Sequence, residues 1–412
     1  MTGGPSQESD SYASGRRSTR RDGGGGGGGG RGTGGGNAQP RRGASRRALI
    51  TGLGGTALLG LGGWYLASRD RGTEPAATPS ASTEPSAAAE PSATFNGPTM
   101  GGWYAGASGI GVADGKFARW LGQPVTIAAT WADQDDSAQR KMTALTREYR
   151  DWDQAIDLAV GGTVLESDEN YAEAAKGAYD DRWRSAAQVI AARRGNLQAP
   201  TFVRCFHEMN GDWYKNWELK PDNIEAYKAS HIRYAKILRE AMPKVYITWS
   251  PNFRDHSGIP IEQWYPGDEW VDVVAPDYYD DADTDARYSV SAWNAEADDV
   301  DKVGNPLGVE AWRRFAEKHG KPLGFPEMGL KPDFGSDHPE WIKAFNAWLN
   351  QHPNTATWEL GTPIPAEAAG KVLYSCYFNV DHGGDNGFTI YGTGANPNSA
   401  KMFRSLRWGR SA

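Results

Sequence analysis

A histidine and a glutamate stand side by side at positions 207 and 208, in RCFHEMNGDWY, with apolar and aromatic side chains on both sides. An unpaired carboxylate in an apolar setting costs several kcal/mol or takes up a proton instead. A carboxyl group that keeps its proton near neutral pH can act as a general acid. As half of the zinc motif H-E-x-x-H the pair fails, because Gly211 occupies the place of the second histidine. Glu208 is therefore a candidate for acid-base chemistry without zinc.

A second glutamate, Glu327, lies in the apolar stretch KPLGFPEMG at 321–329. When one carboxyl group is protonated and another is ionised, the pair can protonate a leaving group and supply a nucleophile. Hydrogen bonds from His207 or Tyr279 would keep Glu327 charged, since they favour the ionised form. Taken alone, each glutamate is better explained by a structural ion pair with an arginine such as Arg204 than by catalysis.

Eight short apolar segments are the candidate strands that must position these groups. They alternate with amphipathic stretches in the later part of the chain, as in NIEAYKASHIRYAKILREAM at 223–242, which favours parallel strands covered by helices. An open doubly wound sheet would call for a G-x-G-x-x-G loop early in the chain, which GGWYAGASG at 101–109 lacks. We therefore predict an α/β fold, a closed (β/α)8 TIM barrel, with strands at 100–106, 125–131, 154–162, 201–208, 245–252, 271–279, 321–329 and 372–380.

In such a barrel the functional side chains lie at the C-terminal ends of the strands. Glu208 ends the fourth predicted strand and Glu327 lies near the end of the seventh. Strict alternation of side chains would send His207 and Glu208 to opposite faces. Both can face the barrel mouth only if the strand frays before the Asn210-Gly211 turn.

The first 98 residues are unlike a folded domain. Residues 1–47 are rich in Gly and Arg and are expected to be disordered, because they cannot bury enough apolar surface to fold. Arg46 and Arg47 precede an apolar segment at 48–67 that resembles a twin-arginine export signal, and a retained membrane anchor remains the alternative. Residues 68–98, rich in Pro, Ser, Thr and Ala, predict an extended linker before a domain at 99–410. An extracellular location, secreted or membrane-anchored, follows from either interpretation.

Charge argues against nucleic acid as a partner. Residues 1–47 hold nine arginines and three acidic residues, so the rest of the chain carries 35 basic and 48 acidic residues, a net charge of −13. The 17 tryptophans suit the flat apolar faces of sugar rings, although many must be ordinary core residues. Cys205 and Cys376 lie too far apart in sequence for a metal-ligand spacing, and we expect both to be small core residues.

Three motifs occur in order along the domain: R-x-x-H-E-M-N-G-x-W-Y at 204–214, W-S-P-N at 249–252 and W-Y-P-G-D-x-W-V-D at 264–272. Together they resemble glycoside hydrolase family 26, a clan A family of retaining endo-glycanases dominated by β-mannanases. The resemblance covers nearly all of residues 99–410, and the first motif is highly specific.

The resemblance implies a role for several residues. Glu208 corresponds to the acid/base and Glu327 to the nucleophile, with His207 beside the acid/base. Asp277 and Tyr279 match a D-x-Y pattern expected near the sugar in the cleaving subsite. Trp213 corresponds to an aromatic residue that stacks on a neighbouring sugar.

The chain departs from the family pattern at one position. The family usually has a tryptophan two residues before an asparagine on the eighth strand, forming the floor of the cleaving subsite. Here Tyr377 stands two residues before Asn379. The resemblance thus predicts a substrate-binding Tyr377, and the substitution weakens the assignment of the sugar.

What the resemblance implies as a whole is a retaining endo-acting hydrolase of β-1,4 linkages in mannan or glucomannan, with no metal and no cofactor. Its partner would be the polysaccharide, with membrane or cell-wall association through the N-terminal segment, and the chain would be a monomer. A β-glucanase or β-xylanase of the same family and a catalytically inactive carbohydrate-binding cell-wall protein are the alternatives. The presence of both glutamates counts against the inactive protein.

Overall fold

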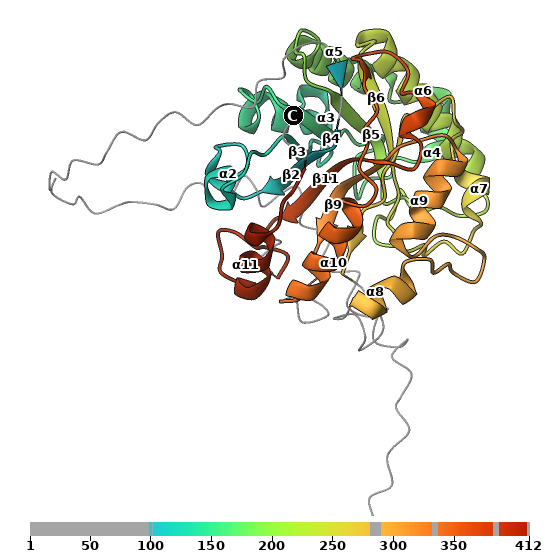
Figure 1. Ribbon diagram of the computed structural model, residues 1–412. Helices are drawn as coiled ribbons and strands as arrows, with labels where there is room; N and C mark the ends of the chain where they lie inside the picture. The colour runs from blue at the N-terminus through green and yellow to red at the C-terminus, as the bar shows by residue number, and fades with distance from the viewer. Residues whose placement is uncertain (1–98, 101, 281–289, 332–336, 382–386, 410–412) are drawn as a thin grey trace, which may run out of the picture. The chain divides into compact units, whose positions relative to one another are not determined.

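The computed structural model describes residues 99–100, 102–280, 290–331, 337–381 and 387–409 (Figure 1). The predicted disordered region at 1–47, the export segment at 48–67 and the linker at 68–98 all lie outside the described residues. Within the described ranges, no helix combines the length and the apolar character needed to cross a bilayer.

Parallel strands form a closed barrel. Neighbouring strands pair in the order β11-β2-β3-β4-β5-β6-β7-β9-β8, and a further pairing of β11 with β9 closes the ring. The short strands β7 and β8 both pair with β9 and together fill one barrel position, which gives eight positions. The barrel strands are β2 (Tyr104–Gly109), β3 (Ile127–Trp131), β4 (Ala155–Ala159), β5 (Thr201–His207), β6 (Val245–Ser250), β7 (Val273–Val274), β8 (Tyr278–Tyr279), β9 (Leu323–Gly329) and β11 (Val372–Asn379).

The prediction of a (β/α)8 barrel with eight strand positions is therefore confirmed. The first strand begins later than predicted, at Tyr104 instead of residue 100. The preceding residues form β1 (Thr99–Met100), which pairs antiparallel with β10 (Trp358–Glu359) outside the barrel. Gly102 separates β1 from β2 with a φ of 72°, a conformation that suits glycine and interrupts an extended chain.

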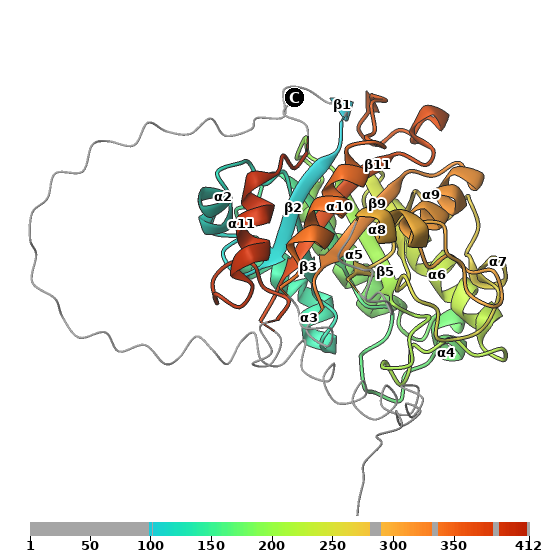
Figure 2. The same cartoon turned by 60° about the horizontal axis from the view of Figure 1, so that its bottom comes forward.

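Helices cover the outside of the barrel (Figures 1 and 2). Residues 170–195 form two helices, because Gly177 adopts a φ of 94° and ends the first of them. The described α-helices are α2 (Lys116–Leu121), α3 (Asp136–Lys141), α4 (Tyr171–Lys176), α5 (Asp180–Arg194), α6 (Ile224–Ala241), α7 (Ile261–Trp264), α8 (Val290–Glu296), α9 (Val309–Lys318), α10 (Pro339–Leu349) and α11 (Pro397–Ser405). A π-helix at Ala144–Glu148 and a 3-10 helix at Ala366–Ala368 complete the helical segments.

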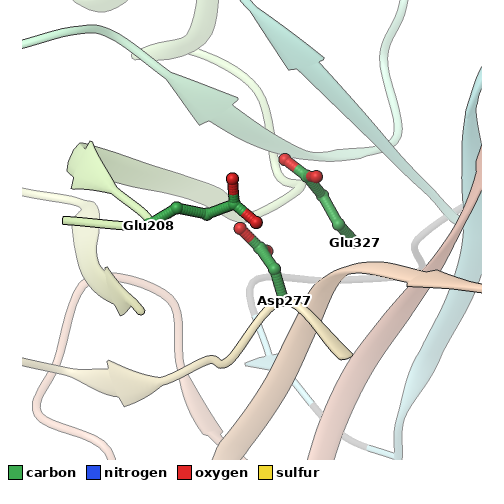
Figure 3. Close-up of side chains that lie close together, drawn as sticks. All are labelled: Glu208, Asp277 and Glu327. Carbon is green, nitrogen blue, oxygen red and sulfur yellow. The ribbon is translucent and has the colours of Figure 1, made fainter. Parts of the chain in front are cut away.

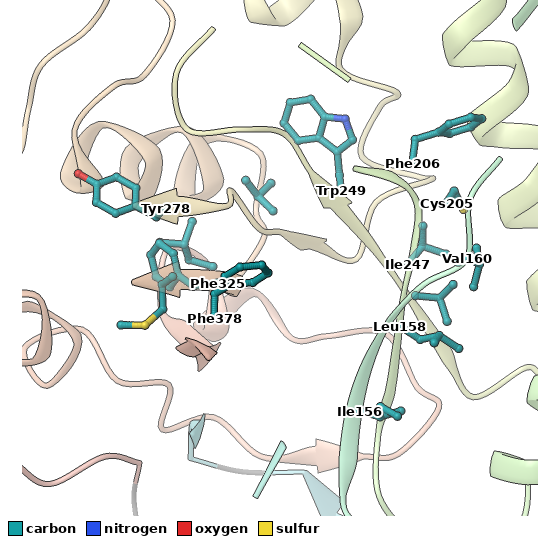
Figure 4. Packing of buried hydrophobic residues seen from close by; sticks show 14 of the residues in the cluster. Ile156, Leu158, Val160, Cys205, Phe206, Ile247, Trp249, Tyr278, Phe325 and Phe378 are labelled. Atoms are coloured by element: carbon teal, nitrogen blue, oxygen red, sulfur yellow. The ribbon is translucent and has the colours of Figure 1, made fainter. Parts of the chain in front are cut away.

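The strands separate two hydrophobic layers. Alternate residues of β4, such as Ile156 and Leu158, belong to the large outer cluster that the helices cover (Figure 4). A smaller cluster, which includes Phe202 and Tyr374, fills the inside of the barrel. The two free cysteines are buried, Cys205 in the outer layer and Cys376 in the inner one, in agreement with their prediction as core residues.

Candidate active site

Three carboxylates from separate strands meet at one end of the barrel (Figure 3). Glu208 follows the last residue of β5, Asp277 precedes β8 and Glu327 lies in β9. One carboxylate oxygen from each lies within 4.8 Å of the other two. The three residues are only 7%, 0% and 6% exposed, respectively. Because β5, β8 and β9 all run in the same direction, this is the C-terminal end of the barrel, where the loops form the mouth.

The backbone of Glu208 leaves the strand conformation. Strand β5 ends at His207, its pairing with β6 shifts register between Arg204 and His207, and Glu208 has a φ of 49°. Its N–H donates to the carbonyl of Ser250 at 2.7 Å, while its own carbonyl accepts from Gly211 at 3.0 Å. A non-glycine residue in the left-handed region is strained and persists where its surroundings hold it. Strand β5 therefore frays at Glu208, before the Asn210-Gly211 turn, as the sequence required for His207 and Glu208 to face the mouth together.

The Glu208 carboxylate is held by two neutral donors. Nε1–H of Trp213 donates to Oε2 at 3.0 Å, and Nδ2–H of Asn252 donates to Oε1 at 2.8 Å. Burial, together with the nearby charge of Glu327, raises the pKa of Glu208 to about 7, although both hydrogen bonds act to lower it. Near neutral pH this carboxyl group can therefore carry a proton or release it.

The Glu327 carboxylate has a different environment. Nη1–H of Arg204 donates to its Oε1 at 2.8 Å, and Nε1–H of Trp131 donates to the same oxygen at 2.9 Å. The Tyr279 hydroxyl donates to Oε2 at 2.9 Å. Three donors, one of them a cation, thus converge on this carboxylate. Of the two donors that the sequence suggested for Glu327, Tyr279 makes the bond, and the described contacts include none from His207.

Arg204 anchors these acids from inside the barrel. Its side chain is fully buried, its Nε–H donates to Asp157 at 2.6 Å, and its Nη1 lies 3.9 Å from Asp277. Asp157 also accepts a hydrogen bond from Tyr374 on the opposite side of the barrel at 2.7 Å. The sequence left open a structural ion pair between Arg204 and either glutamate. In the structure Arg204 forms this ion pair with Glu327, and its described ion pairs include none with Glu208.

Asp277 lies between the two glutamates and is fully buried. Its Oδ1 accepts a hydrogen bond from the Ser250 hydroxyl at 3.2 Å, while Oδ2 has no hydrogen-bond partner among the described residues. Burial and the charge of Glu327 raise the pKa of Asp277 well above its ordinary value. The buried Oδ2 is therefore left unsatisfied beside the two glutamates.

His207 and Trp213 lie on the same side of the mouth. The His207 imidazole is 1% exposed and packs edge-on against Trp217, with ring centroids 4.9 Å apart, and its Nε2 lies 3.4 Å from the Tyr214 hydroxyl. Burial and the charge of Arg204 hold the pKa of His207 well below its usual value, so the ring is neutral. The Trp213 ring is half-buried, and its bond to Glu208 fixes its orientation.

Tyr377 does not lie beside the carboxylates. It is buried on the outer face of β11, where its hydroxyl donates to the carbonyl of Phe388 at 3.0 Å. Its ring meets Phe403 of α11 edge-on, with centroids 5.1 Å apart. The prediction that Tyr377 forms the floor of the site is therefore corrected.

The next residue, Phe378, faces the mouth instead. Its ring packs edge-on against Trp131 at 5.5 Å and against Tyr279 at 5.8 Å between centroids, and both of these residues donate to Glu327. Successive side chains of a strand point to opposite faces, so Tyr377 and Phe378 cannot share one. The aromatic side chain that β11 supplies to the site is Phe378.

Two further side chains of the site were not singled out from the sequence. Trp131 ends β3 and Asn252 follows β6, so both stand at the C-terminal ends of barrel strands. This position at the strand ends is the feature from which both residues could have been predicted as part of the site. Asn252 is also the last residue of the motif W-S-P-N. Neither residue titrates, and for this reason a search for acids and bases passes over both.

The three carboxylates also offer oxygen ligands that a hard cation accepts. The guanidinium of Arg204 already lies 2.8 Å from Glu327 and 3.9 Å from Asp277. A permanent cation thus neutralises part of the charge at this point, and a metal ion would compete with it.

A protein-family model matches part of this chain. Residues 163–309 match the model of glycosyl hydrolase family 26, a segment that contains Glu208 and Asp277 and ends before Glu327.

Solved structures of three other proteins resemble the chain. GH26C from Muricauda sp. is 15% identical over 75% of this chain and 90% of its own, with a TM-score of 0.44. A GH26 β-mannanase from Bacteroides ovatus is 16% identical over 74% of this chain and 88% of its own, with a TM-score of 0.43. A GH128 endo-β-1,3-glucanase from Amycolatopsis mediterranei is 11% identical over 74% of this chain and 99% of its own, with a TM-score of 0.42. Identities of this order do not define a substrate. The resemblance to glycoside hydrolase family 26 that the motifs predicted is confirmed by the family model over residues 163–309, and it supports a glycoside hydrolase.

Proposed function

We propose that this chain is a retaining, endo-acting glycoside hydrolase that cleaves β-1,4 linkages in mannan or glucomannan, with Glu208 as acid/base and Glu327 as nucleophile. The observation that carries the proposal is the short separation of the two carboxylates, whose nearest oxygens lie within 4.8 Å. Retaining glycosidases hold their two carboxyl groups about 5 to 5.5 Å apart, whereas inverting ones leave about 6.5 to 9.5 Å for a water molecule.

The environments of the two glutamates support this division of roles. The pKa of Glu208 is raised to about 7, so a proton is available to the leaving group. Glu327 faces Arg204, Trp131 and Tyr279, which favour the carboxylate that a nucleophile must be.

In the first step Glu208 gives its proton to the glycosidic oxygen as the bond from that oxygen to the anomeric carbon breaks. A carboxylate oxygen of Glu327 bonds to the same carbon, which forms a glycosyl ester and inverts the configuration. In the second step Glu208, now a carboxylate, takes a proton from water. The water oxygen attacks the anomeric carbon, Glu327 leaves as a carboxylate, and the second inversion restores the β configuration.

The remaining residues of the mouth would bind the sugars. The unpartnered Oδ2 of Asp277 can accept a hydrogen bond from a sugar hydroxyl, and Tyr279 lies beside the anomeric carbon through its bond to Glu327. Trp213 offers a half-buried aromatic face next to Glu208, suited to stacking on a neighbouring sugar. Phe378 would take the place that the family gives to tryptophan at the floor of the subsite.

Mannan is proposed because of the family resemblance. A panel of β-mannan, glucomannan, lichenan, β-1,3-xylan and β-1,4-xylan tests it with the wild type and Glu208→Ala. Fastest release of oligosaccharides from a mannan is expected. Activity confined to a glucan or a xylan would replace the substrate and keep the mechanism, while no activity on any polymer would favour the inactive carbohydrate-binding protein.

Stereochemistry tests the retaining mechanism separately. Proton NMR during the first minutes of hydrolysis is expected to show the β anomer of the new reducing end before mutarotation produces the α form. An initial α anomer would contradict the nucleophilic role of Glu327.

We further propose that the enzyme works outside the cytoplasm, either secreted or held at the membrane or cell wall by its N-terminal segment. The support is the sequence at 45–67, with twin arginines ahead of an apolar run.

A further inference from the structure

A second polar pair lies beside the glutamates and has no part in the mechanism above. Asp133 follows β3 by two residues, and its Oδ2 lies 3.7 Å from Nδ1 of His207. Both side chains are almost completely buried, with 4% and 2% of their side-chain surface exposed. At 3.7 Å the two atoms are too far apart for a hydrogen bond, although they face each other.

The facing nitrogen of His207 lacks another partner. Nδ1 of His207 is buried and makes no hydrogen bond with any described residue, while Nε2 is directed at Tyr214. The Asp133 carboxylate accepts a hydrogen bond from its own backbone N–H and none from another described side chain. Buried polar atoms are nearly always satisfied, so a facing pair left open beside two reactive carboxylates requires an explanation.

Contacts with Gln139 and Gly161 fix the position of Asp133. The buried side chain of Gln139 donates to the carbonyl of Asp133 at 3.0 Å and to that of Thr163 at 2.9 Å, which ties the loops after β3 and β4 together. Gly161, at a φ of 64°, makes room for the aspartate, because a Cβ there would lie 2.7 Å from Cβ of Asp133. Any side chain at Gly161 would clash with Asp133.

The pair also adjoins the reacting groups. His207 directly precedes Glu208, and Trp131, two residues before Asp133, donates to Glu327. We propose that Asp133 and His207 together bind one hydroxyl group of the glycone, the part of the substrate that Glu327 would hold, and so make Asp133 a specificity-determining residue of the site. This inference rests on the proposed hydrolase function.

The chemistry of the two groups suits a hydroxyl. An oxygen about 2.8 Å from each of two atoms 3.7 Å apart can contact both without moving them. A neutral imidazole and a carboxyl group present one donor and one acceptor, and a hydroxyl group is both. Burial holds the pKa of His207 well below its usual value and raises that of Asp133 to about 7, so a charged pair does not form in place of this arrangement.

The test couples a change in the enzyme to a change in the substrate. The substrates are 2-chloro-4-nitrophenyl β-biosides of the sugar that the wild type cleaves fastest, together with analogues that lack one glycone hydroxyl at a time. The enzymes are wild type, Asp133→Leu and Asp133→Ala, neither of which keeps a hydrogen-bonding side chain at this position. The matched control is Asp135→Asn, which changes an exposed carboxylate of the same loop that caps α3 and which keeps a capping side chain.

For the wild type and Asp135→Asn, removal of one particular hydroxyl is expected to lower kcat/KM about 10-fold or more, because it leaves a buried donor and a buried acceptor without their partner. For both Asp133 variants that same deoxygenation is expected to cost less than about 3-fold, because the partner is already gone. The parent substrate should lose kcat/KM in the variants, chiefly through KM.

Equal sensitivity of wild type and Asp133 variants to every deoxygenation, with melting temperatures matched, would show that Asp133 only supports the loop and would overturn the inference alone. If Asp133→Ala fails to fold, Asp133→Leu decides, because it keeps a side chain of similar size that forms no hydrogen bond. A wild type that cleaves no glycoside would overturn both this inference and the proposed function.

Discussion

Arg204 and Glu327, 123 positions apart in the chain, form a buried ion pair across the inside of the barrel at 2.8 Å. Glu208 lies four residues after Arg204 and yet accepts its side-chain hydrogen bonds from the neutral donors Trp213 and Asn252. The two glutamates therefore have different environments. One is paired with a guanidinium cation, and the other has a pKa raised to about 7.

Replacing Arg204 tests this asymmetry. Arg204→Met leaves the buried carboxylates of Asp157 and Glu327 without their cation, and we expect it to lower the free energy of unfolding by about 3 to 5 kcal/mol and to reduce kcat sharply. Arg204→Lys keeps the charge but cannot bridge both acids with a planar fork, so its activity should also fall. Urea denaturation and steady-state kinetics measure the two effects.

The matched control is Arg194→Met, which removes another buried arginine. Arg194 donates to the carbonyls of Trp152 and Gln154 before β4, at the other end of the barrel from the carboxylates. It should destabilise the protein and leave the kcat of the folded fraction unchanged. Equal loss of kcat in both variants would contradict a specific role for Arg204.

The pH dependence of hydrolysis follows from Glu208. A general acid must be protonated, so kcat/KM on a polysaccharide should fall as pH rises through about 7, the raised pKa of this carboxyl group. Substrates with a 2,4-dinitrophenyl leaving group need no protonation. For them this decrease of kcat/KM at high pH, the alkaline limb of the profile, should weaken or vanish. The measurement is a pH-rate profile from about pH 4 to 10 for both kinds of substrate, and identical alkaline limbs would argue against Glu208 as the acid.

Removing a donor from Glu208 should move this limb in a defined direction. The hydrogen bond from Asn252 stabilises the ionised carboxyl group, so Asn252→Ala should raise the pKa of Glu208 and shift the alkaline limb to higher pH. Trp213→Phe removes the other donor and should act in the same direction. A shift to lower pH in either variant would mean that another group controls the limb.

Much of the fold and part of the site could be predicted from the sequence. All eight strand positions appear as short apolar runs, and both glutamates stand where such runs end. The prediction for Tyr377 rests on its match to the family's tryptophan, and the strand pattern offers no check on that match. Every residue of VLYSCYFN in β11 is buried, since a parallel barrel strand is covered on both faces, and such a run does not alternate. The pattern therefore gave no sign that Phe378, and not Tyr377, faces the mouth.

Other features depend on contacts between distant segments. The pairing of Asp133 with His207 and the ion pair of Arg204 with Glu327 join different strands, and only the closed barrel brings them together. The frayed end of β5 is an exception, because two adjacent polar residues before an Asn-Gly turn already required it.

The proposed export rests on Arg46 and Arg47, which precede the apolar run at 48–67. Twin-arginine signals are addresses read by a receptor, so Lys at both positions should keep the folded enzyme in the cytoplasm although the charge is preserved. Activity and immunoblots of cell fractions measure the distribution. Unchanged export of the double variant would indicate the general secretory route or a simple anchor.

The central claim is that Glu208 and Glu327 divide the chemistry between them, and azide rescue tests it most directly. Glu208→Ala and Glu327→Ala are assayed on a 2,4-dinitrophenyl β-glycoside with and without sodium azide. For Glu208→Ala, glycosylation of Glu327 should remain fast, and azide should restore turnover by attacking the glycosyl ester to give the β-glycosyl azide. Glu327→Ala should form no ester and no β-azide. Equal loss in both variants, with no β-azide from Glu208→Ala, would contradict the assignment.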